Sequence, residues 1–278
     1  MASIVSAINK IVNISACDEN HEGINCEHCG TFIAKHKVEI PALNIDRWVQ
    51  PVCKCVNDIE TKRIRQAETF QQRAEIQKLF SISNLGEKFT KSTLDNFQHR
   101  EGTTNAFKAT KKYIEEYPNW KQEAILIWGT YGNGKSHLAA AVTNTLTAKG
   151  YSVVFQSVPE LLRRIKSTFN KDNKESEHQI MKALLECDLL VLDDIGAEKL
   201  TDWVQEIMFN IIDGRYRKGL PIFYTSNLKP TDLSNQIGPR SYDRLVETSL
   251  TIENKATSFR REIAKGRLQK YLEENHGN

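Results

Sequence analysis

Residues 129–136 read GTYGNGKS, and they directly follow the apolar run AILIW at positions 124–128. This is a predicted strand that runs into the pattern G-x-x-x-x-G-K-[ST], a loop that binds phosphate. Its glycines allow a tight turn in which backbone N–H groups point inward onto phosphate oxygens. The Ala-rich segment that begins at Lys135 predicts a helix whose positive N-terminal end faces the same anion. The stretch therefore predicts a nucleotide-phosphate site between a strand and a helix.

Two residues of this loop have specific expected roles in an ATP site. Lys135 places a cation near the β- and γ-phosphates, and Ser136 offers its hydroxyl to Mg²⁺. We expect the whole loop and the residue after it to bind the nucleotide: Gly129, Thr130, Tyr131, Gly132, Asn133, Gly134, Lys135, Ser136 and His137.

A second motif, LLVLDD at residues 189–194, predicts the catalytic acids. A short apolar run of this kind favours a strand that is buried on both faces of a parallel sheet. The carboxyl ends of such strands are where open α/β sheets bind ligands. We expect Asp193 to be a direct or second-shell partner of Mg²⁺, and Asp194 to orient or deprotonate the attacking water.

Strand and helix patterns alternate through the second part of the chain, which predicts an α/β fold with a mostly parallel sheet and helices on both faces. The expected strands are 124–128, 152–156, 189–193, 221–225 and 250–252. The expected helices are 105–116, 135–148, 160–169, 177–186, 201–217 and 258–273.

The composition of the chain argues against a membrane-spanning or secreted protein. The chain has 278 residues, 40% of them hydrophobic, which suffices for one α/β domain and a small module. The net charge of +3 does not by itself indicate nucleic-acid binding. No apolar run approaches the roughly 20 residues that span a bilayer, and the N-terminus does not resemble a signal peptide. We therefore expect a cytoplasmic protein without membrane contact.

The cysteines gather near the N-terminus, and their spacing predicts a zinc site. Cys26 and Cys29 form a C-x-x-C knuckle, and Cys53 and Cys55 form a C-x-C pair. In a reducing compartment such pairs favour metal binding over disulfides. Four thiolates suit tetrahedral Zn²⁺, and so small a segment needs such a staple to fold. The alternatives replace one thiolate with one of three other residues: Cys17, His28 or His36.

These patterns divide the chain into three expected parts. Residues 1–57 form a zinc-binding module, residues 58–84 a polar helical linker, and residues 85–278 the ATPase domain. Residues 92–97 resemble a short segment that packs near a nucleotide base.

The order of five motifs carries a family resemblance. These motifs are GTYGNGKS, LLVLDDIGAE (189–198), FYTSNL (223–228), GPRSYDRL (238–245) and SFRRE (258–262). Over residues 85–270 this order resembles the DnaC/DnaI helicase loaders and the related IstB transposition ATPases of the AAA+ class. The phosphate loop alone is common to all P-loop ATPases, whereas DDIGAE with the later DRL is more specific for this group.

The resemblance implies roles for further residues. Asn227 matches the sensor that reads the γ-phosphate, and Arg260 matches the sensor arginine of the lid helix. Arg244 matches the arginine finger that reaches a neighbour's nucleotide, and Arg240, one helical turn earlier, is the alternative. An arginine finger acts between subunits, so the resemblance implies an ATP-dependent homo-oligomer. The expected catalytic residues are Lys135, Asp193, Asp194, Asn227, Arg244 and Arg260.

The predicted helix 160–169 also has features of a single-stranded DNA contact. Arg163, Arg164, Lys166 and Phe169 combine cations with an aromatic ring. The matching helix of helicase loaders faces the DNA channel. The alternative is an amphipathic core helix whose basic residues lie in water, and the two readings are compatible.

Together these features predict an ATP-dependent loader of the hexameric replicative helicase onto single-stranded DNA, with a zinc module that contacts the helicase. Many AAA+ proteins have Asp-Glu where this chain has Asp193-Asp194, and the shorter acid predicts slow, partner-stimulated hydrolysis. The unusual cysteine spacing is consistent with a phage-encoded or accessory relative. A transposition helper and a non-hydrolysing, ATP-bound adaptor are the alternatives.

Overall fold

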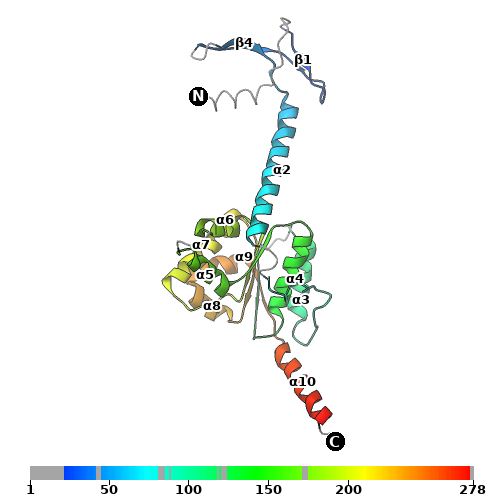
Figure 1. Cartoon of the computed structure of the whole chain (residues 1–278), viewed down its shortest axis with the longest axis vertical. Helices are drawn as coiled ribbons and strands as arrows, with labels where there is room; N and C mark the ends of the chain where they lie inside the picture. Colours follow the sequence, from blue (N-terminus) through cyan, green and yellow to red (C-terminus); the bar gives the residue numbers. More distant parts are fainter. Residues whose placement is uncertain are drawn as a thin grey trace. The chain divides into compact units, whose positions relative to one another are not determined.

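The structure is a computed structural model that describes residues 22–41, 45–80, 85–87, 89–117, 119, 124–170 and 175–275 (Figure 1). The chain divides into two compact units, Met1–Gln71 and Gln72–Asn278. Cys17, one of the alternative metal ligands, lies outside the described residues. No helix in the described part of the chain is both long and apolar enough to cross a membrane.

A five-stranded parallel sheet forms the centre of the second unit. Its strand order is β6-β7-β8-β5-β9, and every neighbouring pair is parallel. The strands are β5 (Ala124–Trp128), β6 (Val153–Ser157), β7 (Leu189–Asp193), β8 (Ile222–Ser226) and β9 (Ser249–Glu253). Each expected strand is present, with ends within two residues of the prediction.

Helices cover both faces of this sheet, as the sequence predicts. Successive side chains of a strand point to opposite faces, so Ile125 and Ile127 join one apolar cluster while Leu126 joins the other. The helices α3 and α4 pack on the first face, and α5 to α9 pack on the second (Figure 1). The helix bounds are α3 (Thr104–Glu116), α4 (Lys135–Ala148), α5 (Val158–Ser167), α6 (Glu177–Glu186), α7 (Asp202–Lys218), α8 (Pro230–Ile237), α9 (Pro239–Thr248) and α10 (Phe259–Asn275).

One helix lies two residues earlier in the chain than the sequence predicts. The expected helix 160–169 is α5, and it ends at Ser167, which leaves Phe169 beyond the helix. The chain tightens there, because the backbone N–H groups of Thr168 and Phe169 bond to carbonyls three residues back. The sequence patterns do not predict α8 and α9, which lie between β8 and β9; the GPRSYDRL motif runs from the N-cap Gly238 into α9.

The N-terminal unit has two small antiparallel hairpins and the start of a long helix. The first hairpin pairs β1 (Ile24–Asn25) with β2 (Phe32–Ile33), and the second pairs β3 (His36–Ile40) with β4 (Ile45–Val49). Among the described residues of this unit, Cys26 alone is buried. Apolar burial of this extent does not stabilise a fold without a further cross-link.

The polar helix expected in the linker 58–84 is α2 (Lys54–Leu79), which starts four residues before that linker. Its last two turns belong to the second unit, where Ile76 and the following Phe80 join the apolar cluster formed with α5 and α6. An ion pair between Arg73 Nε and Asp188 Oδ2, 3.0 Å apart, fixes this end of the helix at the start of β7.

Candidate functional site

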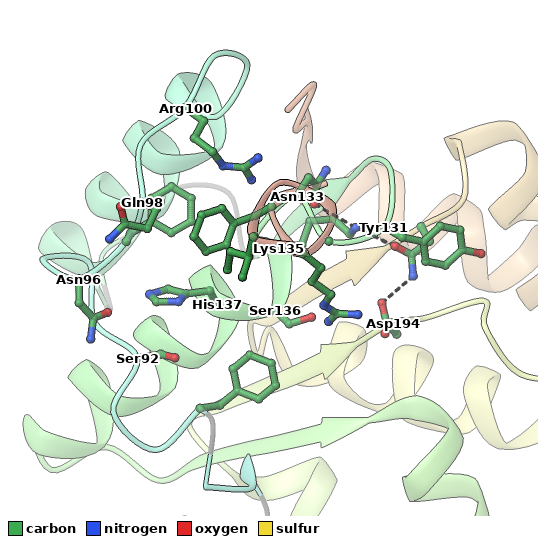
Figure 2. Close-up of a pocket in the computed structure, with 18 of the residues that line it drawn as sticks. Ser92, Asn96, Gln98, Arg100, Tyr131, Asn133, Lys135, Ser136, His137 and Asp194 are labelled. Carbon is green, nitrogen blue, oxygen red and sulfur yellow. Dashed lines mark hydrogen bonds between the residues drawn. The ribbon is translucent and has the colours of Figure 1, made fainter. Parts of the chain in front are cut away.

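A cavity of about 400 Å³ lies at the carboxyl ends of the central strands. It is lined by the phosphate loop, the segment 89–100, the turns after β7 and β8, and the start of α10. Figure 2 shows Ser92, Asn96 and His137 at one side of it, with Tyr131 and Asp194 at the other. Most of the predicted loop residues line this cavity: Tyr131, Gly132, Asn133, Gly134, Lys135, Ser136 and His137. Gly129 and Thr130 belong to the loop but do not line the cavity.

The Lys135 ammonium lies at the centre of the loop. Its Nζ donates to the carbonyls of Gly129 and Thr130, both at 3.0 Å, and to Asn133 Oδ1 at 3.2 Å. A fourth bond of 2.8 Å reaches Asn227 Oδ1 at the end of β8. Burial lowers the pKa of Lys135 to about 8, against the opposing effect of Asp194 and Asp193. The ammonium is therefore held among uncharged oxygens, where phosphate oxygens would be stronger acceptors.

The structure brings the two acids and Asn227 together, because β7 and β8 are neighbours in the sheet. Asn227 Nδ2 donates to Asp194 Oδ1 at 2.8 Å, so this amide joins Lys135 to the acid. Asp194 has a φ of 57°, and it is the one non-glycine with positive φ among the described residues. The Thr225 hydroxyl accepts from the Asp194 backbone N–H, which fixes this turn. Strained turns of this kind occur where a side chain must be aimed at a ligand.

Asp193 is buried below the cavity rather than in its lining. Burial raises its pKa to about 6, and the charge of Asp194 adds to this, while hydrogen bonds from Thr225 and Ser136 oppose it. The Thr225 hydroxyl donates to Asp193 Oδ1 at 2.5 Å. A carboxylate beside the Ser136 hydroxyl is an oxygen donor set that suits Mg²⁺.

Aromatic side chains form the other end of the cavity. Phe89, Phe97, His137 and Phe259 line it, and the rings of Phe97 and His137 lie 5.4 Å apart. The segment 92–97 contributes Ser92, Asn96 and Phe97 to the lining. Flat apolar rings of this kind suit a purine.

Sequence reasoning did not identify several lining residues: Phe89, Gln98, Arg100, Phe259 and Ile263. Phe259 lies in the SFRRE motif, but the motif points to the arginine beside it, and the other four residues belong to no motif.

Arg260, on α10, lines this cavity. Its charge opposes protonation of Lys135, which places the two cations near one another. A Cβ on Gly132 would lie 2.5 Å from Ser258 Oγ, so this glycine allows the chain before α10 to approach the loop. Helix α10 therefore starts directly on the phosphate loop.

The two candidate arginine fingers lie on α9 and do not line this cavity. Arg244 is 26% exposed, and its Nε forms a 2.7 Å ion pair with Asp213 Oδ1 of α7. Its guanidinium also lies 5.1 Å from the centre of the Phe209 ring. Arg240 is exposed, one turn earlier on the same helix.

The four candidate DNA contacts separate into exposed and anchored residues. Arg163 is 76% exposed on α5, Lys166 is exposed, and Phe169 is 58% exposed. Arg164 differs, because it donates to Glu175 Oε1 and to the Leu79 carbonyl, and lies 4.4 Å from the centre of the Phe80 ring. Its contacts hold the end of α2 against α5.

The four predicted cysteines form one cluster in the N-terminal unit. The sulfur atoms of Cys26, Cys29, Cys53 and Cys55 all lie within 4.8 Å of one another. The Sγ–Sγ separations are 3.5 Å for Cys26–Cys55, 3.6 Å for Cys29–Cys53 and 3.4 Å for Cys53–Cys55. A tetrahedral zinc ion with Zn–S bonds of about 2.3 Å holds its sulfurs about 3.8 Å apart. This set fits a metal ion, and neither His28 nor His36 belongs to it.

Local structure explains why these spacings work. Gly30 has a φ of 71° and closes a turn in which its N–H donates to the Cys26 carbonyl, so both sulfurs of the knuckle point the same way. Cys53 directly precedes α2, and Cys55 lies in its first turn. A hydrogen bond from Thr31 is the largest of the effects that lower the pKa of Cys29 to about 6.

Comparison with known proteins agrees with this site. The family model of the IstB-like ATP binding protein matches residues 60–266. The replicative helicase loader DnaC of Buchnera aphidicola subsp. Baizongia pistaciae is 30% identical over 190 residues, which cover 68% of this chain and 77% of that protein. The replicative helicase loader DnaI of Bacillus subtilis is 24% identical over 233 residues, 82% of this chain and 68% of that protein.

A solved structure shows the same fold. The crystal structure of the DnaC helicase loader superposes with a TM-score of 0.55 at 23% identity, over 61% of this chain and all of that chain. The predicted AAA+ fold class is thereby confirmed. The replicative helicase loaders DnaC and DnaI are similar to this chain, and the chain belongs to the IstB-like ATP binding protein family.

Proposed function

We propose that this protein is an ATPase that loads the hexameric replicative helicase onto single-stranded DNA. One observation carries the ATPase part of the proposal. Lys135, Asn227 and Asp194 form a continuous chain of hydrogen bonds at one cavity, and Arg260 stands at its mouth. These are the side-chain types that bind a γ-phosphate and orient a water molecule.

Each residue has a part in this proposal. The loop amides and Lys135 hold the phosphates, and the aromatic wall with Phe97 holds the base. Ser136 and Asp193 hold Mg²⁺, which when bound draws charge from the phosphate oxygens. Asp194 orients the attacking water, and Asn227 and Arg260 respond to the γ-phosphate. An Asp at this position has a short reach, and we therefore expect slow hydrolysis.

The proposal includes an ATP-dependent homo-oligomer, which the position of the α9 arginines supports. They lie outside the cavity of their own chain, so a second copy is needed to bring one to the phosphates. Arg244 is engaged with Asp213, whereas Arg240 is exposed. This difference supports Arg240 as the residue that reaches a neighbour, with Arg244 supporting its helix.

The exposed residues of α5 and the turn after it supply the DNA contact in this proposal. Arg163, Lys166 and Phe169 combine two cations with an exposed ring, which suits a backbone and its stacked bases. Arg164 anchors α2 and is not assigned to DNA.

The N-terminal unit binds the helicase in this proposal. Its Zn²⁺ is held by Cys26, Cys29, Cys53 and Cys55. The experiment is co-elution of the full chain with a purified replicative helicase in ATP and Mg²⁺. We expect a complex that is lost in the Cys26→Ser/Cys29→Ser variant while that variant still binds ATP. Absence of any complex with the wild-type chain would contradict the proposal.

A second candidate is a transposition helper, favoured by the match to the IstB-like family model. That function predicts ATP-dependent binding and bending of double-stranded DNA in the absence of helicase. A duplex-bending assay by fluorescence energy transfer separates the two, since a helicase loader prefers single strands.

A further inference from the structure

The linker 254–258, between β9 and the lid helix α10, runs between two loops that it touches very closely. A Cβ on Gly129 of the phosphate loop would lie 2.3 Å from the Asn254 carbonyl oxygen. A Cβ on Gly102, in the turn before α3, would lie 2.6 Å from the Ala256 nitrogen. Both glycines have positive φ, 144° and 84°, so neither position accepts another residue without strain. Backbone therefore meets backbone on both sides of the linker.

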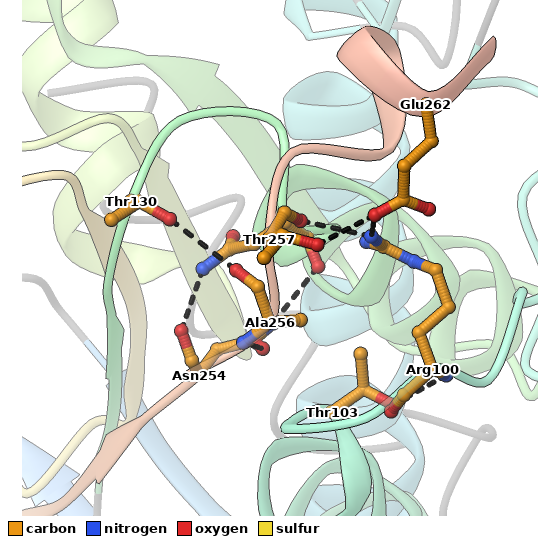
Figure 3. A network of polar contacts seen from close by, with 8 residues as sticks. Arg100, Thr103, Thr130, Asn254, Ala256, Thr257 and Glu262 are labelled. Carbon is orange, nitrogen blue, oxygen red and sulfur yellow. Dashed lines mark hydrogen bonds and ion pairs between the residues drawn. The ribbon is translucent and has the colours of Figure 1, made fainter. Parts of the chain in front are cut away.

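Side-chain amides join the linker to the phosphate loop. Asn133 Nδ2 donates to the Asn254 carbonyl at 2.8 Å, and Asn254 Nδ2 donates to the Asn133 carbonyl at 3.1 Å. The two residues are 0% and 1% exposed, so no water competes for these bonds. Two further bonds continue the contact, from Thr130 Oγ1 to the Ala256 carbonyl and from the Phe259 N–H to the Gly132 carbonyl. Figure 3 shows Thr130, Asn254 and Ala256 in this arrangement.

The Asn133 side chain also touches the residue that binds phosphate. Its Oδ1 accepts from Lys135 Nζ at 3.2 Å, while its Nδ2 holds the linker. One amide thus bridges the phosphate-binding ammonium and the peptide that precedes the lid. Phosphate oxygens at Lys135 compete with Asn133 Oδ1 for the ammonium, since charged acceptors form the stronger bonds. A change at Lys135 therefore acts on the group that holds the linker.

The far end of the linker is held just as firmly. An Arg100 guanidinium nitrogen, Nη1, donates to the Thr257 carbonyl at 2.8 Å and to Glu262 Oε1 at 3.0 Å (Figure 3). The same guanidinium lies 5.0 Å from the centre of the Phe259 ring, which lines the cavity. These contacts fix the first turn of α10, where Arg260 begins its reach into the cavity. Because contacts fix the linker at both ends, a displacement of the Asn254 backbone also displaces the first turn of α10.

We propose that Asn133 is a positioning residue that couples the phosphate loop to the lid helix, so that nucleotide bound at Lys135 sets the position of Arg260. The coupling passes from Asn133 to Asn254 and along the linker to α10. This inference rests on the proposed ATP binding and adds a direct route from loop to lid within one subunit.

Hydrogen exchange read by mass spectrometry tests the route on the full chain, with and without a slowly hydrolysed ATP analogue and Mg²⁺. In the wild type we expect slower exchange in the loop peptide 129–137 and a changed rate in the lid peptide 254–265. In Asn133→Ala the loop peptide still slows, and the change in the lid peptide is lost. A lid response equal to that of the wild type in Asn133→Ala would overturn the coupling.

A matched variant controls for loss of any buried amide. Gln156 on β6 is 6% exposed, and its Nε2 donates to the Phe155 carbonyl at 2.7 Å; neither residue lines the cavity or touches the linker. Gln156→Ala is expected to keep the lid response, and its loss there would overturn the special role of Asn133. A wild-type loop peptide that does not slow with nucleotide would instead overturn the proposed ATP site, and with it this inference.

A double-mutant cycle gives a second readout. If Asn133 acts through Arg260, Asn133→Ala weakens ATP binding about fivefold in the wild type and changes it little in Arg260→Ala. The affinity for ADP, which lacks the γ-phosphate, changes less. Equal effects of Asn133→Ala in both backgrounds would contradict the proposal. Asn254→Ala tests the same pair from its other side if Asn133→Ala is unstable.

Discussion

The N-terminal unit has one buried residue among those described, Cys26, whereas the second unit packs two apolar clusters on the faces of a five-stranded sheet. In the first, four sulfur atoms converge where a hydrophobic core would lie. In the second, apolar residues alternate along each strand and are covered by helices. The cysteine cluster fits a metal ion, so we expect the first unit to depend on metal coordination and the second on apolar burial. Each unit should then be lost without the other.

Removal of the metal is the change with the largest expected effect. Structural zinc contributes about 10–16 kcal/mol of apparent binding free energy to small folded units. A strong chelator is therefore expected to unfold the described hairpins of the first unit while ATP affinity of the second unit stays unchanged. Zinc release measured with a chromogenic indicator, alongside the binding of a fluorescent ATP analogue, checks both halves. If the chelator also abolished ATP binding, the two units would not be independent, and the comparison would be wrong.

Lys135→Ala tests the second unit: we expect it to lose ATP binding while both units stay folded. It removes the cation nearest the phosphates, and we expect ATP affinity to fall about 100-fold. The thermal unfolding midpoint should stay near that of the wild type, because a buried ammonium adds little to stability. Isothermal titration calorimetry gives the affinity, and Lys111→Ala on the exposed face of α3 is the matched control. Retained ATP affinity in Lys135→Ala would contradict the assignment of the loop.

Substitution of the two arginines of α9 is expected to change different properties, stability for Arg244 and ATP hydrolysis for Arg240. Arg244→Ala leaves the buried Asp213 with Arg217 as its remaining ion-pair partner and should destabilise the second unit by about 1–2 kcal/mol. Arg240→Ala should leave stability unchanged and reduce ATP hydrolysis by the assembled protein about 100-fold. Chemical denaturation and steady-state hydrolysis distinguish the two effects. The reverse pattern would make Arg244 the arginine finger.

The smallest expected effect concerns α5. Arg163→Ala and Lys166→Ala should each weaken single-stranded DNA binding by about 0.5–1 kcal/mol and leave stability unchanged. Arg164→Ala should instead lower stability, because its contacts hold Glu175 and the end of α2. Fluorescence anisotropy with a labelled oligonucleotide at two salt concentrations measures the binding. Equal effects of all three variants on DNA binding would contradict the separation.

The sequence predicts those parts of the molecule that rest on local patterns. Three features have their functional groups only a few residues apart in sequence, so local spacing alone brings these groups together. They are the phosphate loop GTYGNGKS, the acidic end of β7 and each of the two cysteine pairs. Neighbouring strands β7 and β8 then place Asn227 beside Asp194, as the family resemblance implies.

The remaining contacts join residues far apart in sequence, and no local pattern predicts them. Arg100 meets Thr257 across 157 positions, and Asn133 meets Asn254 across 121. Helix α5 ends where the chain forms a tighter turn. The contacts of Arg164 depend on how the end of α2 packs against α5. These features arise from tertiary packing rather than from periodicity.

Helicase loading onto a single-stranded circular DNA tests the central claim most directly. The assay combines the full chain, ATP, Mg²⁺ and a purified replicative helicase, and measures helicase that remains bound to the circle after gel filtration. The account predicts loading with the wild-type chain and none with Lys135→Ala or with the Cys26→Ser/Cys29→Ser variant, since each removes a different unit's contribution. Helicase loading that is as efficient without this protein, or with either variant, would contradict it.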